Sequence, residues 1–164
     1  MKKVWLYGRW VVDVMGTNLP PPPDPALAGA TIEGIDANQN GIRDDVELAI
    51  FEKYPNSARI RAALLQYALA LQTQMTLEVV NKKTFVATIE ELESRAQNCM
   101  RSLLSKDDLE KFIEELNELR NFIENLQYNT KQRKEFIKKL YEENLYTFSA
   151  SNEGCDIDPS SLPN

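Results

Sequence analysis

Apolar residues recur at steps of three and four positions over most of the chain. They form four stripes, in residues 60–75, 85–103, 109–126 and 136–145. This is the spacing of the wide apolar face of a helix that packs on a core. A shorter helix is predicted from about Asp44 to Tyr54. The pattern therefore predicts an all-α fold, a bundle of about four longer helices plus one short helix.

The positions of glycine and proline divide the chain into parts. Neither residue occurs from Asn56 to Glu153, whereas five of the eight prolines lie between Pro20 and Pro25. Both destabilise helix interiors, so the breaker-free stretch is what a bundle requires. We therefore predict an N-terminal arm and Pro-rich extended lead in residues 1–35, a loop and helical bundle in residues 36–148, and a tail in residues 149–164. Short connections predict antiparallel neighbouring helices.

Local signals mark where the helices begin. Pro55 to Ser57 precede the first long helix, and Asn81 to Thr84 are expected to separate two helices. Ser105 with Asp108 is close to a capping box, with Asp in place of Glu. Thr130 is expected to cap the last helix.

Residues 1–16 allow two interpretations. Met1, Lys2 and Lys3 before an apolar run resemble the start of a secretory leader, but Arg9 and Asp13 interrupt it and no clear cleavage site follows. A short strand or ordered arm is the other interpretation, and a mis-assigned start of the chain is the main alternative to it. Nowhere does an apolar stretch approach the length that spans a bilayer, so a membrane-spanning protein is not expected.

Composition excludes several functions. The net charge is -6, which disfavours nucleic-acid binding because such proteins neutralise phosphates with Lys and Arg. The most basic stretch, Lys131 to Lys139, has helical spacing and is interpreted as a solvated helix face. The chain has no histidine and only two cysteines, which removes imidazole-dependent triads and a closed zinc site. We expect no enzymatic activity.

One twelve-residue segment, residues 36–47, has the chemistry of a calcium loop. Calcium prefers six to eight oxygen ligands, supplied in such loops from positions 1, 3, 5, 7, 9 and 12. Gly41 stands at position 6, where the chain must turn sharply. The predicted ligands are oxygen atoms of Asp36, Asn38, Asn40, Ile42 (main chain), Asp44 and Glu47.

This segment resembles the EF-hand calcium loop over twelve of the 164 residues. Gly29, Gly34 and the proline run disfavour an incoming helix, so the resemblance is to loop-then-helix sites of the dockerin type. Position 8 is Arg43, where EF-hand loops usually place an apolar residue that pairs with a second loop. No second loop exists in this chain, which favours a single structural site over a calcium sensor.

A metal-free interpretation of the same residues remains open. Asn40-Gly41 is a turn signal by itself. Asp44 or Asp45 could cap a helix that begins at Val46, with Glu47 placed favourably in its first turn. The alternation of oxygen-bearing side chains at positions 36, 38 and 40 favours calcium, because a turn needs only one of them.

The two cysteines also allow two interpretations. Cys99 lies on an apolar stripe and Cys155 in the tail. In the first, they form a disulfide, which would indicate an oxidising compartment. In the second, Cys99 is a buried thiol and Cys155 is an exposed thiol.

Over most of its length the chain resembles uncharacterised bacterial envelope proteins with a helical body. The shared features are Pro20 to Pro25, the segment Gly34 to Glu47 and the segment Cys155 to Asp158. The resemblance implies export to the periplasm or cell envelope and calcium binding, but no activity. The first hypothesis is a non-enzymatic, calcium-stabilised protein that acts through protein contacts. The second is an intracellular helical adaptor without metal.

Overall fold

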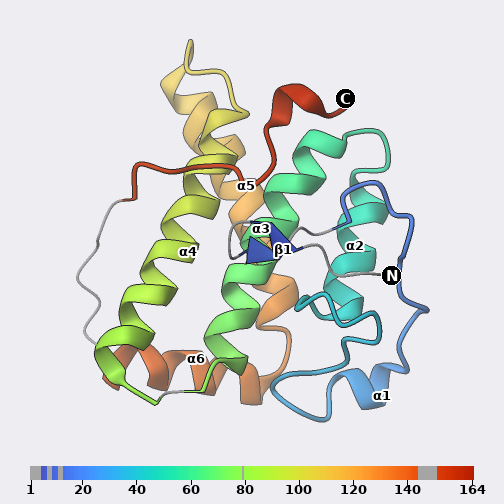
Figure 1. Cartoon of the computed structure of the whole chain (residues 1–164), viewed down its shortest axis with the longest axis vertical. Helices are drawn as coiled ribbons and strands as arrows, with labels where there is room; N and C mark the ends of the chain where they lie inside the picture. The colour runs from blue at the N-terminus through green and yellow to red at the C-terminus, as the bar shows by residue number, and fades with distance from the viewer. Residues whose placement is uncertain (1–4, 7–8, 11–12, 79, 144–150) are drawn as a thin grey trace.

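The computed structural model describes residues 5–6, 9–10, 13–78, 80–143 and 151–164. Within these residues the fold is the predicted helical bundle, with four longer helices and one shorter one, to which the one-turn helix α1 is added (Figure 1). The elements are β1 (Trp5–Leu6), β2 (Arg9–Trp10), α1 (Pro25–Ala28), α2 (Asp44–Lys53), α3 (Ala58–Thr76), α4 (Lys82–Ser102), α5 (Leu109–Gln127), α6 (Lys131–Glu143) and the 3₁₀ helix η1 (Pro159–Ser161).

Helix α3 is the centre of the bundle. It packs against α2, α4, α5 and α6, and in Figure 1 it stands between α2 and α4. Its side chains from Ala63 to Leu65, together with Tyr67 and Ala68, have no solvent exposure. A helix buried on nearly all sides explains why residues 58–76 carry almost no charge beyond their first turn.

Helix α6 departs from the predicted antiparallel arrangement. Figure 1 shows it lying crosswise to α3 and α4 at one end of the bundle. Phe85 and Ile89 of α4 form a separate small core with Ile137 and Leu140 of α6. Side-chain packing at the helix end, rather than the short connection from α5, therefore sets the direction of α6.

Most predicted helix starts are confirmed. The side chains of Ser57 and Asn81 accept main-chain hydrogen bonds at the starts of α3 and α4. Thr130 Oγ1 accepts one from the Arg133 amide at the start of α6, at 3.2 Å. The capping role expected of Ser105 was wrong: Asp108 is the N-cap of α5, and Ser105 instead donates to Asp107.

The lead contains a helix that was not predicted. Asp24 accepts hydrogen bonds from the amides of Ala26 and Leu27, and Pro25 occupies the first helical position. An Asp cap followed by Pro is a strong start signal, and it outweighs the extended character of the proline run for one turn. Before it, β1 and β2 are two-residue antiparallel strands in which Trp5 lies opposite Trp10 and Leu6 opposite Arg9, in place of the one short strand considered for this stretch.

Buried arginines fasten the lead to the bundle. Arg61 of α3 donates from Nε to the Val14 carbonyl at 3.0 Å. Arg133 of α6 donates to the carbonyls of Ala28, Thr31 and Ile32. Its exposed fraction is 1%, so the interpretation of residues 131–139 as a wholly solvated face was wrong at this position. A carbonyl in an irregular segment needs a donor when it is buried, and a guanidinium supplies several.

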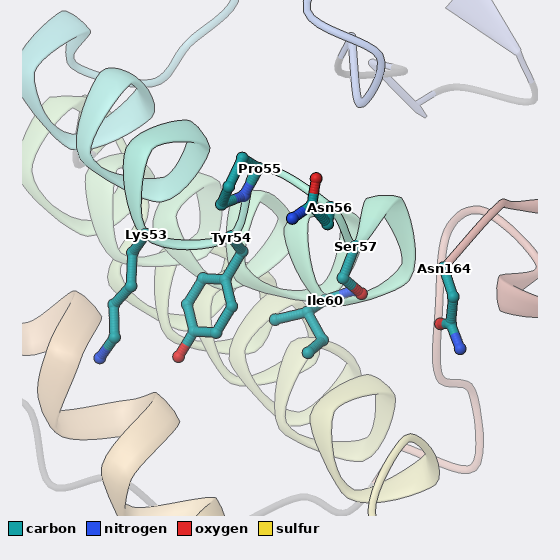
Figure 2. A pocket seen from close by; sticks show the side chains of 7 residues that line it. All are labelled: Lys53, Tyr54, Pro55, Asn56, Ser57, Ile60 and Asn164. Carbon is teal, nitrogen blue, oxygen red and sulfur yellow. The ribbon is translucent and has the colours of Figure 1, made fainter.

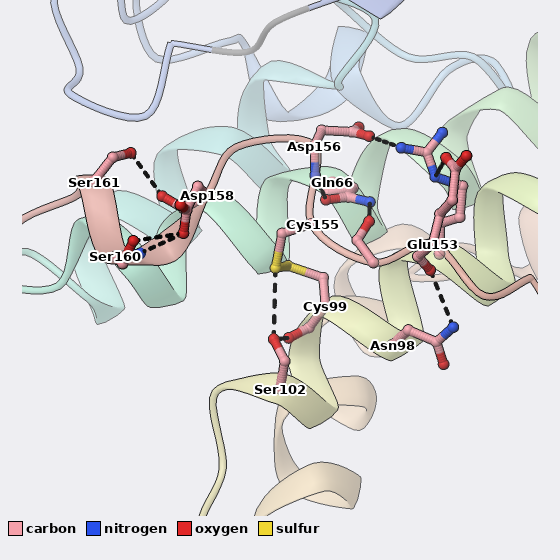
Figure 3. The surroundings of a disulfide bond; sticks show 12 residues. Gln66, Asn98, Cys99, Ser102, Glu153, Cys155, Asp156, Asp158, Ser160 and Ser161 are labelled. Atoms are coloured by element: carbon pink, nitrogen blue, oxygen red, sulfur yellow. Dashed lines mark hydrogen bonds and ion pairs between the residues drawn. A yellow bond between two sulfur atoms is a disulfide. The ribbon is translucent and has the colours of Figure 1, made fainter.

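The tail is stapled to α4 by a disulfide between Cys99 and Cys155 (Figure 3). Of the two interpretations considered for the cysteines, the structure therefore has the disulfide and not two separate thiols. Arg95 forms ion pairs with Glu153 and Asp156 on either side of the bond. Gln66 of α3 donates to the Gly154 carbonyl and accepts from the Asp156 amide. The predicted boundary between residues 148 and 149 lies outside the described residues.

A partly buried polar group, the Glu93 side chain of α4, lies among side chains of α3 and α5. Glu93 accepts hydrogen bonds from Gln74 and Gln97, each at 3.0 Å. Burial raises its pKa, an effect that the nearby Arg120 guanidinium partly offsets and that the Glu124 carboxylate reinforces. The charged form of Glu93 is therefore disfavoured in the folded protein.

Two tyrosines, the buried Tyr67 and the partly buried Tyr128, are further titratable groups at this site. The Tyr67 hydroxyl donates to Glu124 at 2.7 Å, and burial raises the pKa of both phenols. Both therefore stay neutral between pH 4 and 8.

No described helix of the protein is long and apolar enough to cross a membrane.

Removing the disulfide should lower stability. Cys155→Ala frees a loop whose ends are 56 residues apart. The chain-entropy model then gives a loss of about 4 kcal/mol in the free energy of unfolding, measured by urea denaturation of the oxidised proteins. Ser102→Ala is the control, because Ser102 Oγ touches the Cys155 sulfur at 3.6 Å without closing a loop. Equal stability of wild type and Cys155→Ala would contradict a stabilising bond.

Glu93→Gln should change how stability depends on pH. Because the folded-state pKa of Glu93 is raised, wild type gains stability as pH falls through that pKa, whereas the neutral variant lacks this gain. The free energy of unfolding of the variant, relative to that of wild type, should therefore be highest near pH 8 and should fall toward pH 4. Parallel urea titrations would test this, with Glu91→Gln on the exposed face of α4 as the control. A stability difference that is constant with pH would contradict the raised pKa.

Candidate metal centre

The loop at residues 36–47 joins the lead to α2 and is seated on α3. Gly41 has φ +88°, and a Cβ there would lie 2.8 Å from Leu69 Cδ1 of α3. The next side chain, Ile42, is fully buried in the core. The Asp44 amide donates to the Ile35 carbonyl at 2.8 Å, which closes the two ends of the turn. The backbone conformation therefore favours glycine at position 41, and a Cβ there would in addition displace the flexible end of the Leu69 side chain.

Asp36 organises the first half of the loop. Its Oδ1 accepts from the Asn40 amide at 3.0 Å and its Oδ2 from the Gly41 amide at 2.8 Å. Asn40 Oδ1 in turn accepts from the Ile42 amide at 2.8 Å. These bonds wrap the main chain around the Asp36 carboxylate.

Glu47 brings the two halves of the loop together. Its carboxylate has no solvent exposure, although it belongs to a surface loop and the first turn of α2. Oε2 accepts from Asn38 Nδ2 at 3.0 Å, and Oε1 accepts from Asn40 Nδ2 at 2.8 Å. Three predicted ligands, at loop positions 3, 5 and 12, are therefore in direct contact.

Asp44 does not serve as the helix cap that the metal-free interpretation allowed for. It is the first residue of α2, is 1% exposed, and accepts from the Ala37 amide with both carboxylate oxygens, at 3.0 and 3.1 Å. Asp45 instead pairs with Arg43. The N-cap position of α2, held by Arg43, has no side-chain cap.

Burial, reinforced by neighbouring negative charge, raises the pKa values of two carboxyl groups in the loop, Glu47 and Asp44. Burial raises the pKa of Glu47 to about 7, against the hydrogen bonds from Asn38 and Asn40, and the charges of Asp44 and Asp36 add to the rise. Burial also raises the pKa of Asp44, partly offset by the Ala37 amide and reinforced by Asp36 and Asp45. Negative charge is thus concentrated in a place with little water to solvate it.

The donor set fits a hard cation in kind. It combines three carboxylates, two amides and the Ile42 carbonyl, all of them oxygen donors. Yet among the described residues no group of three or more His, Cys, Asp or Glu side chains stands ready to hold a metal ion. Asn38 and Asn40 turn Nδ2 toward Glu47, so a cation would require both amides to present Oδ1 instead.

Two features of the loop were not predicted from the sequence, a contact of Asn38 and the burial of Arg43. Asn38 Nδ2 also donates to the Asn18 carbonyl at 3.0 Å, which ties the loop to the lead. Arg43 is completely buried, although the sequence marked it only as a departure from the usual apolar residue. The burial of this charged side chain could not be predicted from local sequence, because its partners lie in another helix, α5.

A shallow hollow elsewhere on the surface has none of the predicted ligands in its wall. It measures about 400 Å³ and lies at the turn between α2 and α3 (Figure 2). The lining residues are Lys53, Tyr54, Pro55, Asn56, Ser57, Ile60 and Asn164. Lys53 is the one charged side chain among them, so the hollow offers no acid–base pair.

The chain was compared with models of protein families, with curated proteins and with solved structures. None of the three comparisons gave a match. Function is therefore inferred from the geometry and chemistry of the chain itself.

Proposed function

We propose that this is a non-enzymatic helical protein stabilised by one calcium ion in the loop of residues 36–47. The observation that carries the proposal is the buried Glu47 carboxylate, in contact with Asn38 and Asn40 and raised in pKa by burial and by the charges of Asp36 and Asp44. A buried carboxylate beside two others is costly unless a cation or proton neutralises it. Calcium would supply that neutralisation.

The choice of calcium rests on ligand chemistry. Six oxygen donors with a combined charge of -3 suit Ca²⁺, which accepts flexible arrangements of six to eight ligands. Mg²⁺ demands tight octahedral geometry and retains waters, so a site with this many protein donors suits Mg²⁺ less well than Ca²⁺. The ligands would be those predicted: Asp36, Asn38, Asn40, Ile42, Asp44 and Glu47.

The role proposed for the ion is structural. The loop lies between the lead and α2, and Ile42 joins it to the core. Neutralising Glu47 would hold the loop in one conformation and fix the lead on the bundle. A single site without a paired loop is a poor sensor, because nothing in the described part of the chain offers a second loop for it to move against.

An extracytoplasmic location is proposed with the calcium site. Disulfides persist mainly in oxidising compartments, and a bond joins Cys99 to Cys155. Calcium also reaches millimolar concentration outside the cytosol, where weak sites of this kind are filled. The protein would act there through contacts with another protein. The alternative is an intracellular, metal-free adaptor.

Calcium should raise the melting temperature of the wild-type protein. With a Kd of about 10⁻⁴ to 10⁻³ M, as in extracellular modules, about 10 mM Ca²⁺ would add roughly 1.4 to 2.7 kcal/mol of stability. Glu47→Gln should abolish this shift while folding without calcium at least as stably as wild type, since it removes a buried charge. Calorimetry with and without chelator measures both effects.

Glu52→Gln is the matched control for this test, because Glu52 lies on the exposed face of the same helix. It should keep the full response to calcium. The same melting temperature for wild type with calcium and with chelator would sink the calcium proposal and favour the metal-free adaptor. A larger shift with Mg²⁺ than with Ca²⁺ would overturn the choice of metal.

The compartment is tested by the redox state of the cysteines in cells. We expect non-reducing peptide mapping, after alkylation at harvest, to recover Cys99 and Cys155 in one linked peptide. The physical reason is that a bond this well supported by neighbouring contacts persists where no thiol buffer reduces it. Two alkylated cysteines would instead place the protein in a reducing compartment.

A further inference from the structure

Arg43 is a fully buried charged side chain within the candidate metal loop. It lies between Ile42 and Asp44, two of the predicted ligands, and its own exposure is 0%. Nε and Nη2 bind the two carboxylate oxygens of Asp45, at 2.5 and 3.0 Å. This two-bond geometry fixes the plane of the guanidinium.

The other donors of Arg43 reach the C-terminal end of α5. Nη2 donates to the Leu126 carbonyl at 2.5 Å and Nη1 to the Gln127 carbonyl at 3.1 Å. The last carbonyls of a helix have no partner within it and carry the negative end of its dipole. A guanidinium is well suited to both conditions, so Arg43 caps α5 from a loop more than eighty residues away in sequence.

The α5 end is itself anchored. Gln127 has no exposure and donates from Nε2 to the Ala68 carbonyl of α3 at 2.9 Å. On its other side the stem of Arg43 is covered by the lead, because a Cβ at Gly34 would lie 2.2 Å from Arg43 Cδ. The side chain is therefore held from three directions: by α5, by Asp45 and by the lead.

We infer that Arg43 is a positioning residue of the metal site and couples that site to the C-terminal end of α5. The inference rests on the proposed calcium function. The main chain at Arg43 connects directly to the Ile42 carbonyl and to Asp44, so holding its side chain fixes the orientation of both. Metal binding and the capping of α5 then favour the same conformation of the loop.

Electrostatics alone gives the opposite expectation. Arg43 is a cation in the same loop as the proposed Ca²⁺, so its removal should strengthen calcium binding if charge were its only influence. The positioning role requires weaker binding. The direction of the change in Kd therefore separates the two, and a loss of global stability would not by itself produce it.

The test is calorimetric titration of folded protein with CaCl₂. Wild type should bind, and this first titration tests the proposed function alone. Arg43→Met, which keeps the apolar stem, should weaken binding by roughly 10- to 100-fold, the range seen when groups that orient metal ligands are lost. Arg43→Lys should weaken it less, since Lys keeps a charge but loses the two-bond geometry.

Arg95→Met is the matched control. Arg95 is also buried, at 3% exposure, but it binds Glu153 and Asp156 of the tail. Its loss should leave the Kd for calcium unchanged. If wild type binds calcium and Arg43→Met binds as tightly or more tightly, the inference is overturned while the proposed function stands. If wild type does not bind, both are lost.

Hydrogen exchange of wild type keeps the inference testable if Arg43→Met does not fold. Calcium should slow exchange at residues 126–129, at the end of α5, as well as in residues 36–47. Protection confined to the loop would overturn the coupling. The slowing at 126–129 should be absent in Glu47→Gln, which ties it to the metal.

Discussion

Buried guanidinium groups that donate to main-chain carbonyls hold the irregular parts of this protein against its helices. Arg61 and Arg133 bind carbonyls of the lead, and Arg43 binds those at the end of α5. Each replaces a missing secondary-structure partner, which a buried carbonyl requires. Arginine can do this because it carries five donors and keeps its charge when buried. These bonds act together with the burial of Val14 and Ile42 in the core and with the bond from Gln72 to the Glu33 carbonyl.

The helical body was predictable because its information is local. Apolar spacing and the absence of Gly and Pro from residue 56 to 153 located α3 to α6, and Asn81 and Thr130 marked two of the starts. The crosswise direction of α6 was not predictable, since it depends on which side chains of α4 face Ile137 and Leu140. Arg133 shows the same limit, because its partners lie about a hundred residues away.

The candidate site was predictable in its composition but less so in its surroundings. The alternation of oxygen-bearing side chains before Gly41, with Glu47 to follow, identified Asn38 and Asn40, which contact the buried carboxylate, and Asp36, which binds the main chain of the same turn. Local pattern left open whether Asp44 capped a helix, and its bonds to the Ala37 amide decide against that. The supports from Asn18, Leu69 and α5 arise from tertiary packing and leave no periodic trace in the sequence.

Gly34 has a consequence for how this sequence can vary. A Cβ there would lie 2.2 Å from the stem of Arg43 and 2.9 Å from Nη2 of Arg133, and its φ of +69° already excludes most side chains. The packing of both arginines therefore depends on the absence of a side chain at position 34, although the three residues lie in the lead, in the loop and in the last long helix. A sequence that lost glycine at position 34 would have to give up the packing of Arg43 at the same time, whereas either arginine could change while the glycine was kept.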